Sequence, residues 1–114
     1  MAILYGIKNC DTVKKAKQWM DKRQIKYSFH DYRNEGIDEK LVQQFFSQFG
    51  WEKVLNTNSN TYRQLPEWQK DIMTEELAME LILEDPTMIK RPIIKKGREW
   101  EVGFSEEKYQ ALFD

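Results

Sequence analysis

The sequence contains one cysteine and one histidine, Cys10 and His30, among its 114 residues. A single cysteine cannot form a disulfide within the chain, which favours a reducing compartment, and we expect a cytoplasmic protein. One cysteine and one histidine cannot make a structural zinc site, so no metal is predicted. No apolar run approaches the roughly 20 residues of a membrane-spanning helix. The N-terminus carries no pattern of an export signal.

The sequence also lacks an excess of charge of one sign. Its 18 Lys and Arg residues nearly cancel its 19 Asp and Glu residues. A nucleic-acid-binding protein needs a concentrated basic face, so direct binding of nucleic acid is not expected. Hydrophobic residues make up 40% of the chain, enough for a core without disulfide or metal. Repeats and flexible linkers are missing too, and we predict one domain over residues 1–114, acting as a monomer.

The first third of the chain predicts a βαβ unit. Residues 2–7 form a short apolar run typical of a strand, and residues 27–32 alternate like a second strand. Between them, residues 12–22 place apolar side chains at helical spacing, with lysines on the other side. Two strands joined by a helix in this way are expected to lie parallel.

The rest of the chain predicts helices followed by a hairpin and a last helix. Helical patterns cover 38–50 and 74–83, with Asp38 and Thr74 as N-caps, and the polar stretch 56–66 predicts a loop with a short helix. Strands are predicted at 88–94 and 100–104, and a final helix opens at Ser105. The order βαβ, helices, ββα predicts an α/β thioredoxin-like fold. It has a mixed four-stranded sheet and a helical insertion at approximately 36–86.

Cys10 lies between the first predicted strand and the first predicted helix. The free N–H groups at a helix start stabilise a thiolate and can also hold an anion. Lys8 and Lys14 add positive charge nearby, whereas Asp11 opposes it. The residues alone leave two interpretations open, because a lone cysteine is often a small buried core residue.

Four segments carry a resemblance to a known family: YGIKNCDTVKKA (5–16), LNTNSNTYRQL (55–65), IKRPII (89–94) and VGFSEEKY (102–109). In this order and spacing they closely resemble the arsenate reductase ArsC family, especially its YffB- and Spx-like branch. The resemblance covers essentially the whole chain. It implies a thioredoxin fold with a helical insertion and a catalytic role for Cys10.

The resemblance also implies the surroundings of the thiol. Pro92 would be a cis-proline facing the active-site turn, and Arg91 would point its guanidinium at a bound oxyanion. The full set of residues expected to bind substrate or thiol is Asn9, Asp11, Thr12, Lys14, Asn56, Arg63, Arg91 and Pro92. Thr12 has two alternative roles, a hydrogen bond to the thiolate or a helix cap.

The sequence departs from the family pattern at the oxyanion site. Arsenate reductases of the family use three arginines, but here Asn56 stands at the first position and Gly103 near the third. Asn58 stands where the YffB branch carries an arginine, and the nearest basic residue is Arg63. Each lost charge-assisted hydrogen bond costs about 1.5–3 kcal/mol, so arsenate binding is expected to be weak.

No second cysteine follows Cys10 in the pattern Cys-x-x-Cys. A mixed disulfide on Cys10 therefore needs an outside thiol, and we predict a monothiol oxidoreductase with glutathione as co-substrate, no bound cofactor, and glutaredoxin as a further candidate partner. The alternative is an Spx-like, redox-sensing module that docks on RNA polymerase without turnover. His30 is predicted to pack in its strand with one hydrogen bond rather than act as a base. Trp68 fits either a partner contact or packing of the insertion.

Overall fold

The computed structural model describes residues 2–114, which form two compact units. The first unit consists of the N-terminal part up to Gly36 together with Arg91–Asp114, and the second is Ile37–Lys90. The first unit contains every strand of the sheet and the second is helical. Most of the insertion predicted at approximately 36–86 falls within this second unit, which continues to Lys90. We describe each unit by itself.

The sheet of the first unit has the strand order β2-β1-β3-β4. Its strands are β1 (Ala2–Gly6), β2 (Tyr27–Asp31), β3 (Ile93–Lys96) and β4 (Glu99–Val102). β1 is parallel to β2 and antiparallel to β3, which in turn is antiparallel to β4. This mixed sheet is the predicted thioredoxin-like arrangement.

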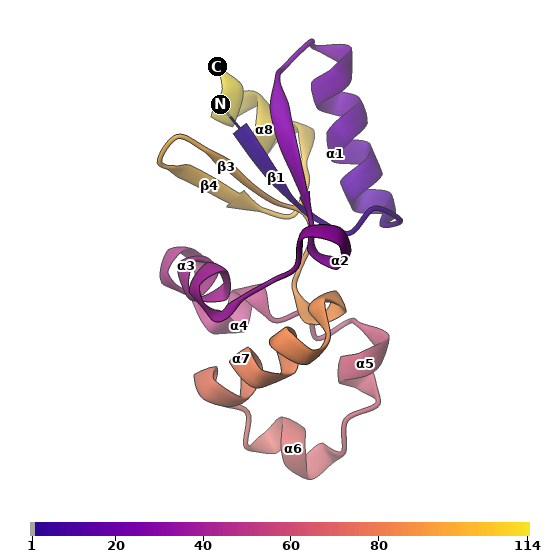
Figure 1. Cartoon of the computed structure of the whole chain (residues 1–114), viewed down its shortest axis with the longest axis vertical. Helices are drawn as coiled ribbons and strands as arrows, with labels where there is room; N and C mark the ends of the chain where they lie inside the picture. The colour runs from indigo at the N-terminus through magenta and orange to yellow at the C-terminus, as the bar shows by residue number, and fades with distance from the viewer. Residues whose placement is uncertain (1) are drawn as a thin grey trace. The chain divides into compact units, whose positions relative to one another are not determined.

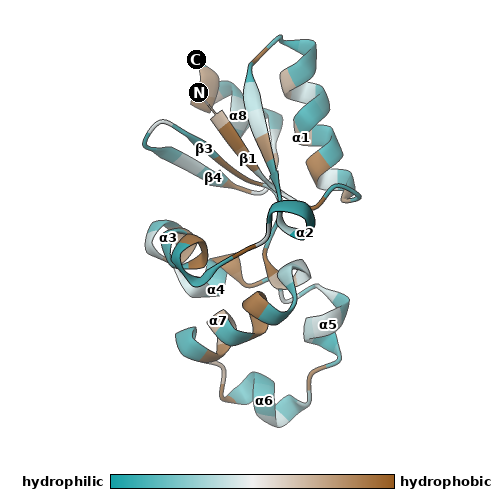
Figure 2. Ribbon diagram, viewed as in Figure 1, coloured by the Kyte–Doolittle hydropathy of each residue, from teal (hydrophilic) through white to brown (hydrophobic). Residues whose placement is uncertain are grey.

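The core of the first unit forms where α1 (Asp11–Lys22) and α8 (Glu106–Phe113) pack on the sheet (Figure 1). Leu4 and Ile94 face each other across β1 and β3 and are both fully buried. Met20 and Tyr109 cover them from the two helices. In Figure 2, α1 is mostly hydrophilic with hydrophobic bands. Its buried residues, Val13, Ala16, Trp19 and Met20, are the predicted helix-period stripe, which is therefore confirmed as the buried face.

The second unit is a group of helices with one short β-bridge. The helices are α3 (Glu39–Phe49), α4 (Trp51–Val54), α5 (Asn60–Arg63), α6 (Glu67–Asp71), α7 (Glu75–Glu84) and the 3₁₀ turn η1 (Pro86–Met88). The predicted N-caps are confirmed: Asp38 accepts a hydrogen bond from the Leu41 amide at 2.8 Å, and Thr74 accepts one from the Leu77 amide at 3.2 Å. Leu55 and Ile89 form the bridge.

Three sequence predictions need correction. The strand predicted from residue 88 begins only at Ile93, because Pro92 has no N–H to donate to the sheet and residues 86–88 form the turn η1. The strand predicted to include Tyr32 ends at Asp31. The Asp31 carboxylate caps the Arg33 amide at 2.9 Å and opens the helical turn α2 (Tyr32–Glu35).

The third correction concerns the start of α1. Cys10 rather than Thr12 is the N-cap residue, and Thr12 is the second residue of the helix.

No helix among residues 2–114 is both long and apolar enough to cross a membrane.

Candidate functional site

Cys10 is the N-cap residue of α1, directly after the loop that follows β1. Its backbone is extended, with φ −102° and ψ 127°, and its carbonyl accepts the first helical hydrogen bond, from the Lys14 amide at 3.0 Å. Its own amide donates to the carbonyl of Ile7 at 3.3 Å. These two backbone bonds, to Lys14 and Ile7, hold the residue in place. The Cys10 side chain is half-buried, so part of it remains accessible.

The donors around the sulfur favour the thiolate. Burial raises the pKa of the Cys10 thiol, but the donor groups of the Arg91 side chain and of the Val13 amide nearby lower it. The positive charge of Arg91 and the Thr12 amide lower it further. The result is a pKa below the ordinary value of a cysteine thiol. The Cys10 side chain makes no cap hydrogen bond to the first turn of α1, so the amides of that turn are free and lend their partial positive charge to the N-terminal end beside the sulfur.

The chain brings Arg91 to Cys10 at the turn that enters β3. The Arg91–Pro92 peptide bond is cis, which confirms the form expected for Pro92. The Pro92 carbonyl accepts a hydrogen bond from the Gly103 amide at 2.8 Å. Gly103, near the position of a family arginine, has φ +81° and here holds the turn that carries Arg91.

The other predicted site residues of the first unit lie at the start of α1. Asn9, Asp11 and Lys14 are exposed, and Thr12 is half-buried. Thr12 contributes its amide to the thiol. The structure therefore brings Thr12 and Arg91 to Cys10, with exposed polar residues at the start of α1. Pro92 follows Arg91 in the chain, and its place in the site stays a prediction.

Asn56 and Arg63 belong to the second unit. The Asn56 side-chain oxygen accepts a hydrogen bond from the Asn58 amide at 3.1 Å, and the Asn56 amide donates to the Met88 carbonyl at 2.6 Å. These bonds shape the loop between α4 and α5. Arg63 ends α5 with an exposed side chain, and its carbonyl accepts a hydrogen bond from Nζ of Lys70 at 3.2 Å. A role of either side chain in binding stays a prediction.

His30 packs in the sheet, as expected. Its Nε2 donates to the carbonyl of Gly36 at 2.8 Å, and its ring lies 5.3 Å from that of Tyr5 and 5.9 Å from that of Tyr32. This hydrogen bond and the two ring contacts are the packing role that the sequence indicated.

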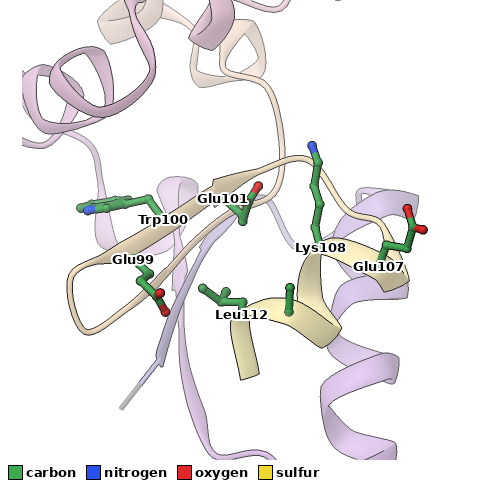
Figure 3. Close-up of a pocket in the computed structure, with 7 residues that line it drawn as sticks. Glu99, Trp100, Glu101, Glu107, Lys108 and Leu112 are labelled. Atoms are coloured by element: carbon green, nitrogen blue, oxygen red, sulfur yellow. The ribbon is translucent and has the colours of Figure 1, made fainter. Parts of the chain in front are cut away.

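A separate hollow of about 540 Å³ lies along β4 and α8 (Figure 3). Three glutamates line it: Glu99, Glu101 and Glu107. Neither a cysteine nor an arginine is among its lining residues. Its lining carries three carboxylates against one lysine, Lys108, which is unfavourable for an anion, and Cys10 is not part of it.

Sequence reasoning missed the Val13 amide as a contributor to the site, and it missed that Gly6 lies against Val13. A side chain on Gly6 would place its Cβ 2.7 Å from Cγ2 of Val13. The signal in the sequence was a lone glycine at the end of an apolar strand, which often marks a close approach of another segment. Sequence alone does not say which segment approaches.

A thioredoxin-like sheet with a cysteine at the start of its first helix, where neighbouring donors lower the pKa of the thiol, is the arrangement of the thioredoxin-like fold class and supports a thiol oxidoreductase-like role. Within that class the model of the ArsC family matches residues 5–112. The chain belongs to the ArsC family. The resemblance seen in the sequence is thereby confirmed.

Three relatives show the range of this similarity. The solved structure of a protein named YFFB is 44% identical, with a TM-score of 0.91 and 97% of each chain covered. An arsenate reductase (ArsC) related protein from Brucella melitensis is 41% identical, with a TM-score of 0.81, covering 99% of this chain and 94% of that one. The global transcriptional regulator Spx of Streptococcus agalactiae is 27% identical over 98% of this chain and 82% of its own.

Proposed function

We propose that this protein is a monothiol oxidoreductase that uses Cys10 as nucleophile and glutathione as reductant. The observation that carries the proposal is the Cys10 sulfur itself, half-buried and held by Arg91 and the first amides of α1. A thiolate at neutral pH is the reactive form of cysteine. Family membership and the similarity to an arsenate reductase related protein support thiol chemistry at this position.

The reaction that suits a single thiol is reduction of a mixed disulfide. The Cys10 thiolate attacks the glutathione sulfur of the substrate disulfide, which forms a Cys10–glutathione disulfide and releases the substrate thiolate to take up a proton. A second glutathione, as thiolate, then attacks the glutathione sulfur of that adduct. Oxidised glutathione leaves and the Cys10 thiolate returns. The net reaction consumes one glutathione thiol: the substrate disulfide becomes a free thiol, and the incoming glutathione leaves joined to the substrate's own glutathione as oxidised glutathione.

The test is a glutathione-dependent reduction assay with the wild type and Cys10→Ser. Serine keeps the size of the side chain but is not a nucleophile at neutral pH, so turnover is expected to disappear. Equal rates would contradict the proposal. Arsenate, tested in parallel, is expected to be a poor substrate because Arg91 alone stands for the three arginines of the family.

A second candidate is a partner-binding module of the Spx type. Two observations favour it: the similarity to Spx, and an exposed pair of apolar residues, Trp68 and Ile72, with 65% and 57% of their surfaces accessible. Under this proposal the chain docks on RNA polymerase and Cys10 is a sensor. A pull-down of polymerase from cell extract that is stoichiometric, lost in Trp68→Ala and unchanged in Cys10→Ser favours the module.

A further inference from the structure

β1 and α1 touch at Gly6 and Val13, four and three residues from Cys10. A Cβ on Gly6 would lie 2.7 Å from Cγ2 of Val13 and 3.7 Å from Cε1 of Phe29. The first distance is shorter than side chains tolerate. Gly6 is not among the glycines with positive φ, so any residue can adopt its backbone conformation. The requirement for glycine at this position is therefore steric.

Val13 has little freedom to yield to an added methyl group. Its side chain is fully buried and packs in the core of the first unit with Leu4 and Ala16. A valine in a helix has one strongly preferred rotamer, because both methyl groups stand close to the preceding turn. Pressure from position 6 is therefore expected to move the backbone of the first turn of α1.

That backbone carries the first free amides of α1, and Cys10 is the N-cap residue directly before them. The effect of an amide on a thiolate weakens steeply as their distance and angle depart from the optimum. We propose that Gly6 is a positioning residue for the Cys10 thiolate, because its missing side chain lets Val13 lie against β1 and so keeps the first turn of α1, with its free amides, at the sulfur. This inference rests on the reactive Cys10 thiolate of the proposed function. It adds Gly6, which acts on the sulfur through Val13.

The experiment is a double-mutant cycle read by alkylation of Cys10 with iodoacetamide across pH. The chain has one cysteine, so the probe reports on this sulfur alone. Four proteins are compared: the wild type, Gly6→Ala, Val13→Ala and the double variant. The cycle gives the effect of Gly6→Ala once with Val13 present and once with Val13 replaced by alanine. With Val13 present, Gly6→Ala is expected to slow alkylation at neutral pH by about 3- to 10-fold and to move the pH midpoint upward. In the Val13→Ala background, where the clashing methyl group is absent, the change is expected to be less than about 2-fold.

Two results would overturn the inference: a folded Gly6→Ala variant with an unchanged pH profile, or the same slowing in both backgrounds. Circular dichroism first checks that each variant is folded. If Gly6→Ala alone does not fold, adding Val13→Ala must restore a folded protein with the pH profile of Val13→Ala. If the double variant also fails to fold, Gly6 acts through something other than Val13 and the inference is wrong.

This test separates the inference from the proposed function, because alkylation needs neither glutathione nor a substrate. A wild type without glutathione-dependent turnover but with the expected cycle contradicts the oxidoreductase and leaves the role of Gly6 standing. Turnover in the wild type with a flat cycle supports the oxidoreductase and contradicts the role of Gly6.

Discussion

At the scale of single residues, the Cys10 sulfur is subject to opposing influences. Burial opposes a negative charge on it, whereas Arg91 and the amides of Val13 and Thr12 favour that charge. Arg91 acts twice, through a hydrogen bond and through its charge.

Arg91→Gln is therefore expected to slow alkylation of Cys10 at neutral pH by about 10-fold, since it removes a hydrogen bond to a charged group. Arg91→Lys keeps the positive charge but lacks the planar fork of donors. Its alkylation rate is expected to lie between those of the wild type and Arg91→Gln. The measurement is the alkylation rate against pH. Arg98→Gln, an exposed residue of the β3–β4 hairpin, serves as the control. Identical profiles for Arg91→Gln and the wild type would show that the arginine does not act on the sulfur.

The lowered pKa of Cys10 also predicts a pH-dependent stability. The folded protein releases the thiol proton more readily than the unfolded chain, so the stabilisation is complete above the unfolded pKa of roughly 8.5 and is lost as pH falls through the folded value. Urea unfolding of the wild type and Cys10→Ser, in reductant, measures it. The stability difference in favour of the wild type is expected to be larger at about pH 9 than at about pH 6. A difference that does not grow with pH contradicts the lowered pKa.

At the scale of elements, Asp85 connects three parts of the second unit. Its amide closes α7 on the Leu81 carbonyl, and its carboxylate accepts from the Thr87 amide at 3.0 Å and the Thr87 hydroxyl at 2.7 Å. It also accepts from the hydroxyl of Thr61 in α5, 24 residues away in sequence. One carboxylate thus ties the end of α7, the turn η1 and α5 together.

Asp85→Ala is expected to lower the free energy of unfolding by about 2 kcal/mol, because it removes an N-cap bond and two hydroxyl bonds. Urea titration followed by circular dichroism measures the change. Its neighbour Glu84, exposed at the last position of α7, provides the matched control as Glu84→Ala, for which a change within about 0.5 kcal/mol is expected. If Asp85→Ala and Glu84→Ala lowered the free energy of unfolding equally, the structural role of Asp85 would be contradicted.

A second link between elements joins α1 to β2. The Tyr27 hydroxyl donates to Oδ1 of Asp21 at 3.1 Å. Burial and this bond raise the pKa of Tyr27 to about 12. The folded protein then holds the phenolic proton more tightly than the unfolded chain. The stabilisation is present below the unfolded value of about 10 and is lost as pH rises toward 12.

Tyr27→Phe is expected to make the alkaline loss of stability shallower between about pH 10 and pH 12, since one titrating group disappears. The other tyrosines are present in both proteins, so the difference between their curves isolates Tyr27. Thermal unfolding at several pH values measures it. Parallel curves for the two proteins would mean that Tyr27 ionises alike in the folded and unfolded chain.

At the scale of the whole molecule, packing is uneven along the chain. Neither α5 nor α6 contributes a buried residue, and Trp68 of α6 is largely exposed. By contrast α1 buries four residues, among them Val13 and Met20. Local opening is therefore expected in the α5–α6 segment before α1.

Limited trypsin digestion is expected to cut first after Arg63 or Lys70, in the α5–α6 segment. Mass spectrometry of the early fragments identifies the bond. Lys14 and Lys15 of α1 serve as internal controls, since they are exposed but stand on a helix with a buried face. First cleavage after Lys14 or Lys15 would contradict the expected order of opening.

The sequence predicted the larger elements of this fold because their signals are local. Asp38 and Gly50 bracket α3, and Thr74 caps α7, each within a residue of the predicted bounds. The turn α2 was missed because the Asp31 cap competes with a strand pattern that includes Tyr32. The early start predicted for β3 failed because an apolar run at Ile89 resembles a strand until Pro92 interrupts the ladder.

The site was predictable only in part. The position of Cys10 follows from a strand-to-helix boundary, which is a local signal. Arg91 lies 81 residues further along the chain, and only the family resemblance brought it to the thiol. The contact between Gly6 and Val13 gives no pattern of charge or periodicity in the sequence. It depends on the absence of a Cβ at Gly6, which leaves room for the Val13 side chain.

One of the two outer strands of the sheet, β4, also bears on behaviour in concentrated solution. β4 is four residues long, and Glu99 and Glu101 flank Trp100 on it. If two copies joined edge to edge with Trp100 at the centre, each Glu99 would face a Glu101 of the other copy, and the opposed carboxylates would repel. A free strand edge invites sheets to grow into fibrils, and here that edge is both short and negatively charged.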